Sequence, residues 1–83
     1  MYYVYILRCG DGSLYTGSTF DVQKRLTAHE AGKGAKYTRG RQPLTLVYTE
    51  ACASKRQALR REAAIKRMKK EKKQELIDSF TRE

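Results

Sequence analysis

The sequence contains little cysteine and no long run of apolar residues. Its two cysteines, Cys9 and Cys52, belong to no CxxC pair and to no Cys/His cluster with metal-ligand spacing. This scarcity argues against a zinc site and a disulfide framework, and without a recognisable signal peptide we expect reduced thiols in a cytoplasmic protein. No apolar run approaches the roughly 20 residues of a membrane span, so we expect no membrane partner. Repeats and low-complexity segments are also lacking.

Acidic residues are scarce relative to basic ones. The 83 residues include 18 Lys and Arg against 9 Asp and Glu, which gives a net charge of +9. Ten of the basic residues lie between Lys55 and Lys73, where Glu62 and Glu71 are the only acids. Such clustering indicates nucleic acid as partner ahead of a membrane surface, the alternative being a generic solvated surface. At this length we expect one domain over residues 1–83, and a monomer.

The first 25 residues predict a strand, a turn, a second strand and the start of a helix. Residues 2–9 and 13–18 are strand-like runs, and the Gly-Asp-Gly sequence at 10–12 is typical of a hairpin turn. A two-residue loop would put Tyr5 and Tyr15 on opposite faces of the sheet, whereas a three-residue loop would put them on the same face. The local sequence leaves both registers open.

The rest of the chain predicts a helix over 21–31, a strand over 44–50, and helices over 55–69 and 71–80. No Gly or Pro separates the last two, so one continuous helix is an alternative. The predicted fold class is therefore α/β (α+β), with a three-stranded antiparallel sheet flanked by helices. Strand and helix periodicity define two apolar faces: Leu44, Leu46 and Tyr48 on the third strand, and Ala58, Leu59, Ile65 and Met68 on the 55–69 helix.

The order of these segments resembles the GIY-YIG nuclease superfamily, named for two strand motifs that precede a helix carrying an arginine. The motifs here are Tyr3-Val4-Tyr5 and Tyr15-Thr16-Gly17. The resemblance continues through Arg25, His29, residues 32–39, 46–48 and 61–66, and it is closest to the small stand-alone bacterial members. It implies an endonuclease that hydrolyses phosphodiester bonds with Mg²⁺ or Mn²⁺, acting on DNA ahead of RNA. A shared site would also require the three-residue loop, which places both tyrosines on one face.

The resemblance further implies the roles of individual residues. Tyr15 would activate the attacking water, and Tyr5 would be its supporting hydroxyl. Arg25 would clamp the scissile phosphate, and Glu62 would be the metal ligand. Local geometry offers ordinary alternatives: core packing for the tyrosines, an ion pair with Asp21 for Arg25, and an i,i+4 ion pair with Lys66 for Glu62.

His29 lies one helical turn after Arg25 and is the only histidine. It is either a surface or capping histidine, or a group that hydrogen-bonds the phosphate or relays a proton. The loop over 32–43 is basic and contains three glycines, which would let a nucleic-acid backbone approach closely. Its candidate nucleic-acid-binding residues are Lys33, Lys36, Tyr37, Arg39 and Arg41.

The sequence departs from the family pattern in two respects. Tyr3 stands in place of glycine and Thr16 in place of isoleucine. The chain also contains no Asn, whereas some members place an asparagine on a later helix of the site. The alternative function is therefore a non-catalytic nucleic-acid-binding module that keeps the fold. Larger enzymes of the superfamily carry separate DNA-binding domains, so we expect targeting to come from this chain's own surface or from a protein partner.

Overall fold

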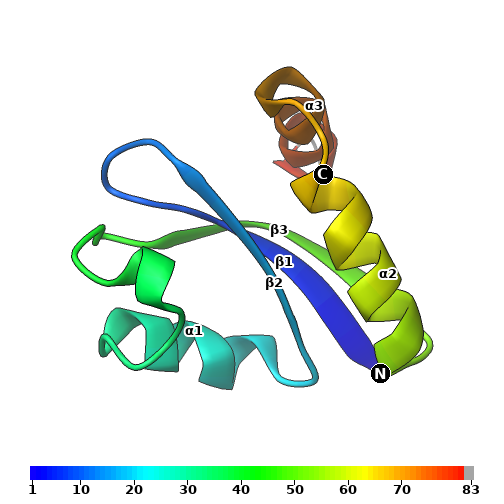
Figure 1. Cartoon of the computed structure of the whole chain (residues 1–83), viewed down its shortest axis with the longest axis horizontal. Helices are drawn as coiled ribbons and strands as arrows, with labels where there is room; N and C mark the ends of the chain where they lie inside the picture. The colour runs from blue at the N-terminus through cyan, green and yellow to red at the C-terminus, as the bar shows by residue number, and fades with distance from the viewer. Residues whose placement is uncertain (82–83) are drawn as a thin grey trace.

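The computed structural model describes residues 1–81, which form one antiparallel sheet with helices on both faces (Figure 1). The strands are β1 (Tyr2–Arg8), β2 (Leu14–Thr19) and β3 (Thr45–Cys52), in the order β2-β1-β3. α1 (Val22–Glu30) covers one face, and α2 (Lys55–Lys66) and α3 (Lys70–Thr81) cover the other. A short 3₁₀ helix, η1, spans Lys36–Thr38. The predicted fold class is confirmed.

The hairpin between β1 and β2 has the three-residue loop. The Cys9 N–H donates to the Ser13 carbonyl at 2.9 Å, and Gly12 closes the turn with a φ of 84°, a conformation that glycine adopts without strain. In the resulting register Tyr5 pairs with Gly17, and Leu7 pairs with Tyr15. Because side chains alternate between faces, Tyr5 and Tyr15 lie on the same face of the sheet, the one covered by α1.

Each face of the sheet has its own core. On the α2 and α3 side, Val4 and Ile6 pack with apolar side chains of both helices and of β3. On the α1 side, Tyr5, Leu7 and Cys9 pack with Leu44, and Leu26 of α1 contacts this cluster. Both faces of β1 are therefore buried, as expected of a central strand. The first cluster comprises Val4, Ile6, Val47, Cys52, Ala58, Ile65 and Ile77.

Two face assignments from the sequence are wrong. Leu44 and Leu46 belong to the α1 side, but Tyr48 packs on the α2 and α3 side. An irregularity in the β1–β3 pairing causes this, because Ile6 pairs with Tyr48 while Leu7 pairs with Leu46. The extra residue reverses the alternation of side chains. Leu59 is the second error: it is 49 % exposed on the outer side of α2 instead of facing the sheet.

The helix ends follow their local sequences. The Asp21 carboxylate caps α1 by accepting from the Lys24 N–H at 3.0 Å, and Ser54 caps α2 in the same way. Gly32, with a φ of 76°, ends α1 in a Schellman motif. The continuous-helix alternative is wrong, since the chain turns between α2 and α3. That turn lets both Ile65 and Ile77 reach the same core.

Over residues 1–81, none of the helices combines the length and apolar character needed to cross a membrane.

Candidate active site

The Tyr5 side chain crosses the backbone of the edge strand β2. Its ring is almost fully buried, and a Cβ built on Gly17 would lie 2.5 Å from the Tyr5 hydroxyl. A glycine at that position therefore lets the phenol pass over β2. The Tyr15 ring lies beside it, with the ring centroids 6.4 Å apart. The sheet thus brings together the two tyrosines that were predicted to share a site.

His29 is fully buried beneath the basic loop, so the hypothesis of a surface or capping histidine is wrong. The helical spacing of α1 places it beneath both tyrosines, and its Nε2 lies 2.9 Å from the Tyr5 hydroxyl. Its Nδ1 lies 2.9 Å from Thr38 Oγ1. Gly34 passes so close to the imidazole that a Cβ there would overlap Nδ1. This glycine serves the packing of the histidine, where the sequence had indicated room for a ligand.

The electrostatics of the site keep both partners of this contact neutral in the free protein. Burial raises the pKa of Tyr5, and hydrogen bonding to Arg25 opposes that rise, while the charges of Tyr15 and Glu62 contribute smaller effects. Burial and the nearby Arg25 charge lower the pKa of His29. The imidazole is therefore uncharged near pH 7 and can accept a proton. Arg25 thus lies beside the Tyr5 hydroxyl, and Glu62 is near enough to influence it electrostatically.

Glu62 reaches the same region from α2. Its carboxylate is 17 % exposed and accepts from Ser18 Oγ at 2.6 Å, which fixes Oε1 at the edge of β2. Its other oxygen, Oε2, pairs with Lys66 Nζ at 2.7 Å. The ion pair that helix geometry had offered as an alternative is therefore present. It is half-exposed, because the Lys66 side chain is 51 % accessible.

The donor set around Glu62 is compatible with one hard divalent cation. Mg²⁺ commonly takes one carboxylate and completes its shell with waters and substrate phosphate. Lys66 would have to give up Oε2, and its exposure leaves it free to turn to solvent. Within residues 1–81, no three His, Cys, Asp or Glu side chains gather closely enough to hold a metal ion through protein ligands alone. A cation at Glu62 would therefore depend on the substrate for further ligands.

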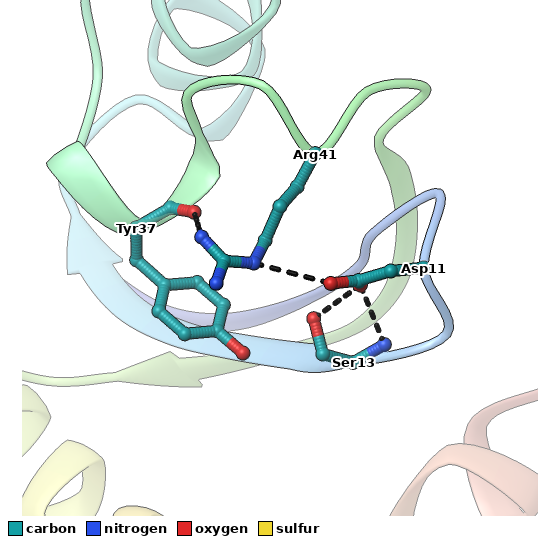
Figure 2. A network of polar contacts seen from close by, with 4 residues as sticks. All are labelled: Asp11, Ser13, Tyr37 and Arg41. Atoms are coloured by element: carbon teal, nitrogen blue, oxygen red, sulfur yellow. Dashed lines mark hydrogen bonds and ion pairs between the residues drawn. The ribbon is translucent and has the colours of Figure 1, made fainter.

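The basic loop is tied to the hairpin turn through Arg41. Figure 2 shows its guanidinium over the Tyr37 ring, 4.2 Å from the centroid, with Nε 3.1 Å from the Asp11 carboxylate. Ser13 donates to the same carboxylate through its backbone N–H and its hydroxyl. These bonds, together with Arg41, lower the pKa of Asp11. The charge of Arg41 is therefore already engaged within the protein, whereas Lys33, Lys36 and Arg39 are exposed.

A groove of about 190 Å³ lies beside this site, between the edge of β2, the basic loop and the last two helices. Its Tyr37 wall is stacked on Tyr15, with centroids 6.0 Å apart, and stays 41 % exposed. Thr16 contributes a hydroxyl that is buried and, within the described part of the chain, has no hydrogen-bond partner. The groove can therefore offer aromatic surface and positive charge to a ligand. Its lining comprises Leu14, Tyr15, Thr16, Tyr37, Lys66 and Lys73.

Comparison with known proteins decides the family. The family model described as GIY-YIG catalytic domain matches residues 1–75. The chain belongs to the GIY-YIG family. All the predicted catalytic and metal-binding positions, from Tyr5 to Glu62, lie within the matched range of this GIY-YIG chain. The GIY-YIG family is a nuclease-type family whose nucleases are generally metal-dependent.

Among its GIY-YIG relatives are small proteins named UPF0213. The one from Halobacterium salinarum is 53 % identical over 77 residues, covering 93 % of this chain and all of the relative. The one from Streptococcus sanguinis is 54 % identical over 79 residues, covering 95 % and 91 %. These names state no substrate, metal or activity, so the relatives show the family and name no reaction.

Two solution NMR structures share the GIY-YIG fold seen here. The UPF0213 protein of Bacillus halodurans aligns with a TM-score of 0.60 at 53 % identity, covering 94 % of this chain and 84 % of that one. A protein from E. faecalis aligns with a TM-score of 0.66 at 39 % identity, covering 99 % and 88 %. The likeness extends over the sheet and the helices of both faces.

Sequence interpretation of this GIY-YIG chain missed Thr38, Ser18 and Lys73. Ser18 could have been found, because it follows Thr16 by two residues in β2. Strand alternation therefore places both side chains on the face of the sheet that meets α2. Lys73 was recognised only as part of a basic cluster. Thr38 gave no local signal, since its contact with His29 depends on how the loop folds back over α1.

Proposed function

We propose that this chain is a divalent-metal-dependent endonuclease that hydrolyses phosphodiester bonds in nucleic acid. The observation that carries the proposal is the Tyr5 hydroxyl, held 2.9 Å from the buried imidazole of His29 and beside Arg25. A buried phenol has a hydrogen-bond partner even when it only packs, but a neutral imidazole as acceptor with an arginine beside the same oxygen also suits proton transfer. Together with Glu62 at the edge of β2, these groups supply a proton acceptor, a phosphate clamp and a metal ligand.

We assign the proton transfer to Tyr5, although the family resemblance had suggested Tyr15. Tyr5 is the phenol that has a neutral imidazole at hydrogen-bond distance. As the water oxygen bonds to phosphorus, its proton passes to the Tyr5 oxygen, while the Tyr5 proton passes to His29 Nε2. The bond from phosphorus to the leaving oxygen breaks, and that oxygen takes a proton from solvent. Tyr15 then serves as packing partner and as part of the groove.

Arg25 and Glu62 act on the phosphate instead of the proton. The planar guanidinium of Arg25 can bind two phosphate oxygens at once and offset the charge that develops on them. Glu62 would hold Mg²⁺ or Mn²⁺, and a cation bound there would add Lewis-acid stabilisation of the same charge. Lys66, displaced from Glu62, would become available to a neighbouring phosphate.

We propose that nucleic acid lies along the edge of β2, over the groove. Lys66 and Lys73 provide charge from one side, and exposed Lys36 and Arg39 provide it from the loop. The rigidly held Tyr37 offers aromatic surface to a base. Arg41 supports Tyr37 and Asp11, so its part in this surface is to hold the wall of the groove in place.

A nucleic-acid-binding module without catalysis is the second candidate. The observation that favours it is the Lys66–Glu62 pair, which occupies one oxygen of the predicted metal ligand. The basic groove and loop would serve such a module equally well. The two candidates differ only in whether a bound strand is cut.

Cleavage of flapped, branched and single-stranded DNA and RNA, with Mg²⁺, Mn²⁺ or EDTA, tests the proposal. We expect metal-dependent cleavage by the wild type, and a loss of about 10²–10⁴ in kcat for Tyr5→Phe, the usual contribution of general-base catalysis. Glu62→Gln should lose metal-stimulated activity, because an amide is a poor ligand for Mg²⁺. Neither change removes positive charge, so binding in EDTA should persist in both variants.

Tyr3→Phe is the matched control, since it removes a phenol oxygen from the same strand and the same face as Tyr5. It should cleave like the wild type. Equal rates for Tyr5→Phe and wild type would refute the assignment of Tyr5. If the folded wild type binds these substrates in a salt-dependent way and cuts none of them, the binding module is the correct function.

A further inference from the structure

Thr38 makes the contact that completes the hydrogen bonding of His29. It is fully buried in η1, with Oγ1 2.9 Å from His29 Nδ1 and 2.8 Å from the Ala35 carbonyl oxygen. Thr38 touches neither Tyr5 nor Arg25 through any of these bonds. Its influence on the site therefore passes through the imidazole.

The donors and acceptors around Thr38 determine which nitrogen of His29 carries the proton. A threonine hydroxyl has one hydrogen, and here it is donated to the carbonyl of Ala35, which can only accept. Thr38 Oγ1 must then accept from His29, so we assign the proton to Nδ1. Nε2 is left with a bare lone pair, and the Tyr5 hydroxyl donates to it.

A competing donor approaches the same nitrogen. The backbone N–H of Ala35 points at His29 Nδ1 from 3.4 Å, which is longer than the Thr38 contact and weaker as a hydrogen bond. Without the threonine oxygen, this N–H would become the partner of Nδ1. The proton would then move to Nε2 and face the Tyr5 oxygen, leaving the Tyr5 proton without an acceptor on the imidazole.

We propose that Thr38 is a positioning residue that holds His29 in the Nδ1–H tautomer, so that Nε2 is free to accept the Tyr5 proton. Its catalytic meaning rests on the proposed nuclease function, whereas the tautomer itself does not. Once Nε2 is protonated, the same oxygen still accepts from Nδ1–H and stabilises the imidazolium. An orienting partner of this kind raises the basicity of the opposite nitrogen.

The placement of Thr38 gives the basic loop a second role. Thr38 directly follows Tyr37, whose ring forms a wall of the groove, and η1 is bounded by the exposed side chains of Lys36 and Arg39. The segment that would face nucleic acid is thus also the segment that fixes the tautomer of the His29 imidazole. The loop has to be folded over α1 for Tyr5 to have a proton acceptor.

The tautomer can be measured directly, because His29 is the only histidine in the chain. Two-bond ¹⁵N–¹H correlation spectra of ¹⁵N-histidine-labelled full-length protein at pH 8 identify the protonated ring nitrogen. We expect Nδ1–H in the wild type, a shift towards Nε2–H in Thr38→Val, and Nδ1–H again in Thr38→Ser, which restores the oxygen. Thr45→Val, at an exposed threonine of β3, is the matched control and should leave the spectrum unchanged.

A second variant keeps the test decisive if Thr38→Val does not fold. Tyr5→Phe removes the partner of Nε2 and leaves Thr38 intact, so we expect it to stay Nδ1–H. The proposal would be overturned if the wild type carried the proton on Nε2, if Thr38→Val kept it on Nδ1, or if Tyr5→Phe changed tautomer. In each case the proton would be placed by something other than Thr38.

Activity provides the functional readout. In Thr38→Val we expect kcat to fall by about 10–100-fold with KM unchanged, and Thr38→Ser to recover it. A Thr38→Val variant that has switched tautomer and keeps the wild-type kcat would overturn the catalytic part of the proposal. A wild type that is Nδ1–H and cleaves nothing would refute the nuclease function and leave the tautomer assignment standing.

Discussion

Buried His29 should link the stability of the protein to pH. Burial, followed by the charge of Arg25, lowers its pKa from the ordinary value of 6.5. Between the unfolded and folded values the unfolded chain binds the extra proton, so the free energy of unfolding must fall as pH drops below about 6.5. Above that pH the imidazole is neutral in both states, and the full contribution to stability is present.

We therefore expect urea denaturation to show a loss of stability as pH falls from 7 to 5, with a slope of at most about 1.4 kcal/mol per pH unit from this residue. His29→Gln removes the titrating group and should flatten the slope, even if the variant is less stable overall. A wild-type curve that is level across this range, or a slope that persists in His29→Gln, would show that His29 does not titrate as its burial requires.

The candidate site residues could be named from the sequence, but their interactions could not. Motif order pointed to Tyr5, Tyr15, Arg25 and Glu62. The structure places Tyr5 beside Tyr15 and Arg25, and Glu62 is close enough to affect the pKa of Tyr5. The bond between Tyr5 and His29 could not be predicted, because helical spacing fixes the face of α1 on which His29 lies and leaves its distance from β1 undetermined. The Glu62–Lys66 pair was predictable, because both partners lie on one helix.

Among the elements, the hairpin turn and the basic loop are linked by one ion pair between their side chains. Asp11 Oδ2 forms an ion pair with Arg41 Nε, and the Gly10 N–H donates a hydrogen bond to the Arg41 carbonyl. Asp11→Asn keeps the side-chain volume but removes the charge, so we expect the loop to loosen locally while the sheet stays folded. Backbone amide exchange at Gly10 and Arg41 should rise severalfold.

Hydrogen exchange followed by NMR measures this change residue by residue. Glu71→Gln, on exposed α3, alters the net charge equally and should leave the loop amides unaffected. Because the pKa of Asp11 is lowered, its contribution is present above its unfolded pKa and is lost as pH falls through the folded value. Unchanged exchange at Gly10 in Asp11→Asn would show that backbone bonding alone holds the loop.

The elements themselves were largely predictable, and the failures have local causes. Tyr and aliphatic runs, Gly12, Asp21 and Ser54 marked most of the boundaries. Tyr48 was assigned to the wrong face, since a bulge against β1 leaves no mark in the sequence of β3. Leu59 was assigned to the buried side of α2 by mistake. The helix is so basic that its single exposed leucine looked like part of the apolar side.

For the molecule as a whole, the distribution of charge predicts which face binds nucleic acid. Neutralising Lys36, Arg39 and Lys73 to Gln removes three positive charges around the loop and the groove. If each contacts one phosphate, the slope of log K against log salt concentration should fall by about 2–3 units. Fluorescence anisotropy in EDTA at several salt concentrations measures the slope in the absence of cleavage.

The matched control neutralises Lys55, Arg56 and Arg60, which removes the same charge from the outer side of α2. Its slope should stay close to that of the wild type. If both triple variants lose the same amount, binding reflects net charge alone. If only the α2 control loses slope, nucleic acid binds on the opposite side of the molecule from the tyrosines.

The strand order has a consequence for how the protein is made. β1 pairs first with its neighbour β2 and only later with β3, which emerges from the ribosome some 40 residues behind β1. A two-stranded hairpin is marginally stable by itself, so His29 cannot be firmly buried until β3 arrives. Every residue to which we assign proton transfer precedes β3, whereas Glu62 follows it. A nascent chain therefore carries the tyrosines, the arginine and the histidine before the carboxylate, and on the proposed function we expect it to acquire the capacity to cut only once α2 has docked.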